Sequence, residues 1–140
     1  MADEGLVIIQ EQGGPRDRKL YAITPRGEEA LRAWLEDPSE YLPPPRNEML
    51  LKLFFGRHVP PEHSLARIQR HAERLRATQV VYEAIAKELA APSAEDDNQA
   101  FWLSTLRHGQ TLLEGSLRWC EEVEHLIGTR REAAQDTTKG

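Results

Sequence analysis

Long repeats of apolar residues constrain the fold of this chain more than any other feature of its sequence. From Pro60-Pro61 to about Ala91, apolar residues return in alternating steps of three and four. This is the pattern of a helix that packs nearly parallel to another helix. One position of the repeat holds Ile68, Leu75, Tyr82 and Leu89, and the other holds Leu65, Ala72, Gln79 and Ala86. We expect one long helix here, packed closely where alanine stands and ended by Pro92.

A second long helix is predicted from about Gln99 to Arg131. One stripe holds Trp102, Leu106, Gly109, Leu113, Ser116, Cys120, Val123 and Ile127, and another holds Leu112, Trp119 and Leu126. An apolar surface this wide needs two partners, one in the same chain and one, we expect, in a second copy. The sequence therefore predicts a homodimer. The candidate dimerisation residues are Leu65, Ile68, Leu75, Tyr82, Leu106, Leu113, Trp119, Val123, Leu126 and Ile127.

The N-terminal stretch has the pattern of a strand, a tight turn, a strand and a helix. A β-branched apolar run at Leu6 to Gln10 is followed by Gly13-Gly14-Pro15 and by alternating residues from Lys19 to Ile23, as expected for a β-hairpin. Thr24 can cap the next helix and Pro25 suits its first turn. Ala30, Leu31, Trp34 and Leu35 form an apolar stripe on that helix.

These segments predict a mainly α-helical fold, in which a β-hairpin is followed by helices and two long C-terminal helices form an antiparallel, dimerising region. We divide the chain into a hairpin and helix at residues 1–36, a proline-rich linker at 37–46, a helical region at 47–131 and a frayed tail at 132–140. Within the helical region, Asn47 is a candidate cap of a short apolar helix and Gly56 its end.

The hairpin tip, Gln12 to Arg18, gathers positive charge in an otherwise acidic protein. Arg16, Arg18, Lys19 and Arg26 against Asp17 give a local charge of +3, whereas the formal net charge is −5. Such a tip can contact phosphates without reading bases. On charge alone, a solvated hairpin tip is the commoner explanation.

The same stretch resembles the wing of the PadR family of winged-helix transcriptional regulators. The resemblance is carried by Asp3-Glu4-Gly5-Leu6-Val7, Gly13-Gly14, Lys19-Leu20-Tyr21 and Ile23-Thr24-Pro25-Arg26-Gly27. Further on, Arg46 to Leu53 followed by Phe54-Phe55-Gly56 is similar to the start of that family's longer, virulence-activator-like dimerisation region.

The resemblance implies a regulator of transcription that binds DNA, with Arg16, Arg18 and Lys19 contacting the backbone and the C-terminal helices forming the homodimer. Some members sense small aromatic or cationic molecules, and Trp102 and Trp119 are the candidate residues, although plain packing is the commoner role of such aromatics. In the family a helix-turn-helix precedes the wing, and it is missing from this chain. A fragment, an internal start codon and a protein that works without that helix all remain open.

An alternative is a helical dimerisation or adaptor protein that does not bind DNA directly. We do not expect an enzyme, a cofactor or a metal site, because no phosphate loop or nucleophile–base set is evident and His63 and His71 lack a third ligand. Cys120 is the single cysteine and is expected to be a small buried hydrophobe. The sequence shows no signal peptide and no membrane-spanning run, which predicts a cytoplasmic protein.

Overall fold

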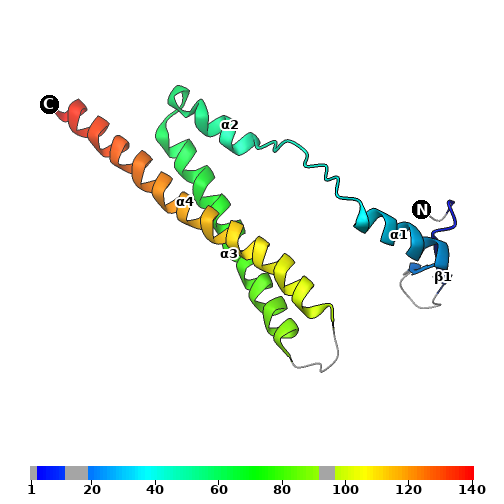
Figure 1. The fold of residues 1–140 in the computed structure, drawn as a ribbon. Helices are drawn as coiled ribbons and strands as arrows, with labels where there is room; N and C mark the ends of the chain where they lie inside the picture. Colours follow the sequence, from blue (N-terminus) through cyan, green and yellow to red (C-terminus); the bar gives the residue numbers. More distant parts are fainter. Residues whose placement is uncertain (1–2, 12–18, 92–96) are drawn as a thin grey trace. The chain divides into compact units, whose positions relative to one another are not determined.

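The computed structural model describes residues 3–11, 19–91 and 97–140. The chain forms two compact units, Met1–Pro45 and Arg46–Gly140. A two-stranded hairpin and one helix make the first unit, and helices make the second (Figure 1). The predicted mainly helical fold, with a hairpin followed by helices, is therefore confirmed.

The hairpin of the first unit consists of β1 (Val7–Glu11) and β2 (Lys19–Ile23). The strands are antiparallel, and their register pairs Val7 with Ile23 and Glu11 with Lys19. The alternating pattern predicts Leu20 and Ala22 inside and Tyr21 outside. Ala22 is half-buried and Tyr21 is exposed, as predicted, but Leu20 is 41% exposed.

One residue, Thr24, links the start of helix α1 (Pro25–Glu36) to the chain just before β1 through hydrogen bonds. The Gly27 N–H donates to Thr24 Oγ1 at 3.0 Å, so the predicted cap is confirmed. The Thr24 hydroxyl also lies 2.7 Å from the carbonyl oxygen of Gly5, and the Thr24 N–H donates to the carbonyl oxygen of Leu6 at 3.0 Å. Thr24 thus ends the hairpin, begins the helix and binds both to the chain before β1.

The second unit begins with α2 (Glu48–Phe54) and a short 3-10 turn, η1 (Gly56–His58). The Leu50 N–H donates to Asn47 Oδ1 at 3.2 Å, which confirms the predicted cap. Several apolar side chains of this segment remain in contact with water, among them Leu51, Phe54 and Phe55. A short helix as apolar as α2 is expected to be covered on most sides, and its own chain does not cover it to that extent.

Helices α3 (Pro61–Ala90) and α4 (Gln99–Lys139) lie side by side as an antiparallel pair (Figure 1). Their contact holds the core of the chain, which consists of Ile68 and Ala72 on α3 and Cys120 and Val123 on α4. Cys120 is only 1% exposed, so its predicted place in the core is confirmed. Met49 and Leu53 of α2 pack against the edge of this core.

Helix α4 extends beyond its predicted end at about Arg131 and reaches Lys139. The last turns contain no proline, and glycine occurs only at Gly140. The hydroxyls of Thr137 and Thr138 donate to the carbonyl oxygens of Ala133 and Ala134 at 2.9 Å, inside the helix. The polar composition that suggested a tail at 132–140 is compatible with a solvent-exposed helix.

Candidate functional site

Only one of the three predicted DNA-contacting residues belongs to the part of the chain that the structure describes. Arg16 and Arg18 lie outside the described residues, and Lys19 is the first residue of β2, with its backbone paired to Glu11. Arg26 is exposed in the first turn of α1. The hairpin that would carry the cations is present, while their role in binding stays a prediction.

Next to the hairpin, an apolar hollow of about 460 Å³ lies between β1, the end of β2 and α1. Leu6, Ile23, Leu31 and Trp34 line part of it, together with Gly27. The predicted stripe on α1 is largely exposed within this unit, since 71% of Trp34 is in contact with solvent.

The ten candidate dimerisation residues separate into three groups. Ile68, Leu113 and Val123 are buried between α3 and α4 of the same chain. Six others are half-buried: Leu65, Leu75, Tyr82, Leu106, Trp119 and Ile127. Leu126 is 65% exposed. The first group therefore forms the contact between the two helices of one chain, and its contribution to a dimer stays a prediction.

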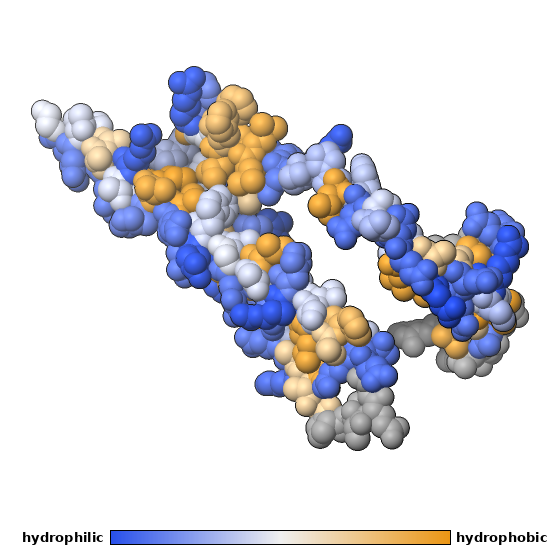
Figure 2. Space-filling model, viewed as in Figure 1, coloured by the Kyte–Doolittle hydropathy of each residue, from blue (hydrophilic) through white to orange (hydrophobic). Residues whose placement is uncertain are grey.

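The second stripe of α4 contributes less to that contact. Leu112 is 59% exposed, Leu126 is 65% exposed and Trp119 lies between them, half-buried. We call these three residues the open stripe. Further apolar surface is visible over α2 and near the end of the α3–α4 pair where α3 ends and α4 begins (Figure 2). This part of the unit has apolar surface that one chain does not cover.

A cleft of about 460 Å³ opens beside the indole of Trp119, and we call it the Trp119 cleft. Met49 and Leu50 of α2, His71 of α3, and Leu112, Gly115 and Trp119 of α4 line it. The rings of His71 and Trp119 meet edge to face, with centroids 6.5 Å apart and planes at 78°. Burial, and then the nearby charge of Arg74, lower the pKa of His71.

Trp102 and Trp119 do not share one site within a chain. They are seventeen residues apart on a continuous helix, a rise of about 26 Å at about 1.5 Å per residue. Only Trp119 lines the cleft, and Trp102 is 49% exposed near the start of α4. Of the two candidates for ligand binding, Trp119 has the surroundings of a site.

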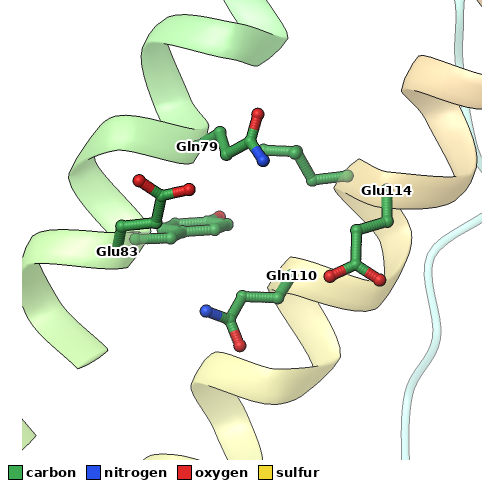
Figure 3. Close-up of a pocket in the computed structure, with 6 residues that line it drawn as sticks. Gln79, Glu83, Gln110 and Glu114 are labelled. Atoms are coloured by element: carbon green, nitrogen blue, oxygen red, sulfur yellow. The ribbon is translucent and has the colours of Figure 1, made fainter. Parts of the chain in front are cut away.

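A polar layer interrupts the apolar contact of α3 with α4. Gln79 and Glu83 of α3 and Gln110 and Glu114 of α4 project into the space between the helices (Figure 3). The cavity that they border measures about 60 Å³. Next to it, Tyr82 lies so close to Gly109 that an added Cβ would stand 3.1 Å from its ring. Glycine at 109 therefore permits the close approach of the two helices.

The helical unit corresponds to a known family model. That model, described as the virulence activator alpha C-term, matches residues 45–128, more than half of the 140 residues. The chain belongs to the virulence activator alpha C-term family. The start of the match falls just before α2, where the sequence motif placed the beginning of this region.

Solved structures of PadR-type regulators share the fold. The Vibrio cholerae virulence activator AphA is 24% identical, with a TM-score of 0.69 over 93% of this chain and 73% of its own. Bacillus subtilis PadR in complex with operator DNA is 20% identical, with a TM-score of 0.66 over 90% of this chain and 73% of its own. The same protein with p-coumaric acid is 20% identical, with a TM-score of 0.67 over 91% and 72%. No curated protein sequence matches the chain significantly. The predicted resemblance to PadR-type regulators is thus confirmed.

The matched family and folds belong to transcriptional regulators rather than enzymes, in agreement with the sequence. In the described part of the chain, no helix is long and apolar enough to cross a membrane. Residues 3–11, 19–91 and 97–140 contain no group of three or more His, Cys, Asp or Glu side chains placed to hold a metal ion.

Sequence reasoning missed the Trp119 cleft. Its walls come from three helices, and the short helix α2 had no predicted position relative to the other two. One signal was available, because Gly115 stands one turn before Trp119 on α4. A small residue beside a large one on a surface stripe indicates a hollow next to an aromatic wall.

Proposed function

We propose that this chain acts as a DNA-binding transcriptional regulator of the PadR type. One observation carries the proposal: its hairpin, helix and helical unit share the fold of a regulator that was solved on its operator DNA. Membership of the virulence activator alpha C-term family supports the same role.

The hairpin supplies the contact with DNA. Arg16, Arg18 and Lys19 bind backbone phosphates, since a tip with several cations suits phosphate oxygens and carries no direct sequence information. The remainder of the chain is acidic, so this contact is local. We therefore expect the chain alone to bind DNA weakly and without sequence preference.

The helical unit makes the homodimer. The open stripe of Leu112, Trp119 and Leu126 is the surface through which two copies associate, because the other apolar stripe of α4 is already used by α3. Burying one large apolar side chain contributes about 1.5–3 kcal/mol, so leaving the stripe in water forgoes a substantial stabilisation.

A small aromatic molecule is the proposed effector of the regulator. The neighbour from Bacillus subtilis was solved with p-coumaric acid, and this chain has an aromatic-lined hollow of suitable size at Trp119. We assign no role in effector binding to Trp102.

Two measurements on the full chain test these statements. Fluorescence anisotropy with unrelated duplexes should give similar, salt-sensitive affinities, and changing Arg16, Arg18 and Lys19 together to Gln should weaken binding. A control with Arg130→Gln and Arg131→Gln, two cations on α4, should bind as the unchanged chain does. Binding by this variant that is as tight as binding by the unchanged chain would contradict the proposed contact.

Sedimentation equilibrium tests the dimer. We expect a dimer at micromolar concentration and a monomer after Leu126→Glu, with Glu122→Gln as a control on the same face. A stable monomer in the unchanged chain would refute dimerisation. A dimer that fails to bind any DNA would favour the adaptor role over the regulator.

A further inference from the structure

A second cleft of the helical unit lies where α2, η1 and the start of α3 meet the later turns of α4. Figure 1 shows α2 beside the start of α3, at one end of the α3–α4 pair. The cleft measures about 360 Å³, within the range of about 300–1,000 Å³ that is usual for small-molecule sites. Leu53, Val59 and Ile127 give it apolar walls, and it shares no lining residue with the Trp119 cleft. We call it the Ser64 cleft.

Ser64 is the only buried polar residue among those described, with 3% of its surface exposed, and it lines the cleft. A buried hydroxyl normally has a hydrogen-bond partner. The Ser64 hydroxyl has none in the part of the chain that the structure describes. Because no fully buried side-chain oxygen in that part lacks a partner, the Ser64 oxygen must be accessible from the cleft. An acceptor atom of a ligand would satisfy it.

Gly56 leaves room for this hydroxyl. A Cβ added to Gly56 would stand 2.9 Å from Ser64 Oγ, closer than real Cβ atoms come to another atom. The φ angle of Gly56 is not positive, so its backbone conformation does not require glycine. Gly56 also lines the cleft. The contact with Ser64 therefore favours glycine here, and a side chain at this position would crowd the hydroxyl.

Two cations from different elements line the same cleft. Arg57 belongs to η1 and Arg130 to α4. The ion pairs among the described residues involve other cations, so neither guanidinium has a carboxylate partner there. Arg57 donates only through Nε, to Nε2 of His58 at 3.3 Å, and its two terminal nitrogens remain available. The cleft therefore combines two uncompensated guanidiniums with an unpaired hydroxyl.

The beginning of α3 adds to the positive potential. The helix starts at Pro61, which lines the cleft, and no side chain caps its first turn. The N-terminus of a helix carries a partial positive charge, which favours an anion nearby. Glu62 in the first turn offsets part of this charge, but it does not line the cleft.

We propose that the Ser64 cleft binds a small phosphate monoester with an apolar group. The phosphate faces Arg57, Arg130 and the Ser64 hydroxyl, which donates to one of its oxygens, and the apolar group lies against the walls. A guanidinium matches the geometry of phosphate oxygens, and two cations match the charge of a phosphate dianion. An apolar helix of a second copy would leave both guanidiniums and the hydroxyl without partners. The binding does not depend on whether the chain contacts DNA.

Three matched probes test the chemistry of the site. Hexyl phosphate has the proposed dianion and an apolar group, heptanoate has a similar chain with a single charge, and 1-hexanol has no charge. Isothermal titration calorimetry of the full chain should show one hexyl phosphate per chain, bound at least about ten-fold more tightly than 1-hexanol. Heptanoate should bind with intermediate affinity. No binding of hexyl phosphate would overturn the proposal, and equal affinities for hexyl phosphate and heptanoate would overturn its assignment to phosphate.

Charge variants locate the site. Arg57→Gln and Arg130→Gln should each weaken the binding of hexyl phosphate about ten-fold and leave that of 1-hexanol unchanged. Arg131→Gln removes the next cation along α4, which does not line the cleft, and should change neither affinity. Equal losses in Arg130→Gln and Arg131→Gln would show a general effect of charge and overturn the assignment. A dimer that dissociates in Arg57→Gln, with no hexyl phosphate bound by the unchanged chain, would mean that a second copy fills the cleft.

Ser64→Ala separates binding from folding. The variant removes a hydroxyl that has no partner within the described chain, so the temperature of thermal unfolding should not fall. Its affinity for hexyl phosphate should fall about five- to ten-fold, because a hydrogen bond to a charged group is lost. An unchanged affinity would remove Ser64 from the site. A lower unfolding temperature with unchanged affinity would show that the hydroxyl serves the fold alone and overturn its proposed role.

Discussion

The hairpin unit and the helical unit are each stabilised internally, by different kinds of contact. In the hairpin unit, backbone hydrogen bonds and the Thr24 hydroxyl join β1, β2 and α1, and Gly27 is the only buried residue among those described there. In the helical unit, side chains of two long helices interlock, and Ile68 and Cys120 are each 1% exposed.

The difference predicts where each unit is sensitive to substitution. A unit fixed by close backbone contacts fails at its small residues, because they set the distance between chain segments. A unit fixed by interlocking side chains fails at its large residues, because each leaves a cavity when shortened. The apolar side chains of the hairpin unit, such as Trp34 and Leu35, are largely exposed, so shortening them should cost little within this chain.

The largest effect is expected at the centre of the helical core. Ile68→Ala should lower the free energy of unfolding by about 2–5 kcal/mol, since Ile68 is fully buried between α3 and α4. Urea denaturation followed by circular dichroism measures it. Val80→Ala on the exposed side of the same helix should stay within about 0.5 kcal/mol. Similar losses at both positions would mean that the core does not lie where we place it.

In the hairpin unit, substitution of the small residue Gly27 should lower the free energy of unfolding by a comparable amount. A Cβ at Gly27 would stand 2.1 Å from the carbonyl oxygen of Leu6, so Gly27→Ala must separate α1 from the start of β1. We expect a loss of about 2–3 kcal/mol. Amide hydrogen exchange in β1 should accelerate while that in α3 does not change. Gly128→Ala, at an open position, should instead stabilise the chain by about 1 kcal/mol.

Substitution of Gly109, at the contact of α3 with α4, should have an intermediate effect on the free energy of unfolding. A Cβ there would stand 3.1–3.2 Å from the ring of Tyr82, so Gly109→Ala requires the two helices to move apart slightly. We expect a net loss of about 1 kcal/mol, because strain exceeds the gain in helix propensity. Thermal denaturation of Gly109→Ala beside Gly115→Ala provides the comparison. A gain at both positions would show that Tyr82 moves aside without cost.

The last comparison concerns the helix caps of the two units. Thr24→Ala removes the bond to the Gly27 N–H and the contact with the Gly5 carbonyl, and should cost about 1–2 kcal/mol. Asn47→Ala removes only the bond to the Leu50 N–H and should cost about 1 kcal/mol or less. Equal costs would show that the link from Thr24 to the chain before β1 adds no stability.

Local chemistry made much of this fold predictable. Thr24 and Asn47 are cap residues whose hydrogen bonds involve only nearby backbone, and the repeat that contains Ile68 and Ala72 defines the face of α3 that meets α4. The end of α4 was not predictable, because a polar helix in water and a frayed tail have the same composition. The ten dimerisation candidates could not be sorted, since an apolar period does not reveal whether its partner lies in the same chain. The Trp119 cleft depends on where α2 packs, which no repeat specifies.

The salt dependence of DNA binding tests the proposed function most directly. The affinity of the full chain for a duplex should fall as salt increases, with a slope of log affinity against log salt close to −0.9 for each phosphate contacted. Replacing Arg16, Arg18 and Lys19 by Gln should reduce the magnitude of that slope by about 2–3, one unit for each lost contact. An unchanged slope in the variant, or no binding by the unchanged chain at low salt, would contradict the assignment of the hairpin as the part that contacts DNA.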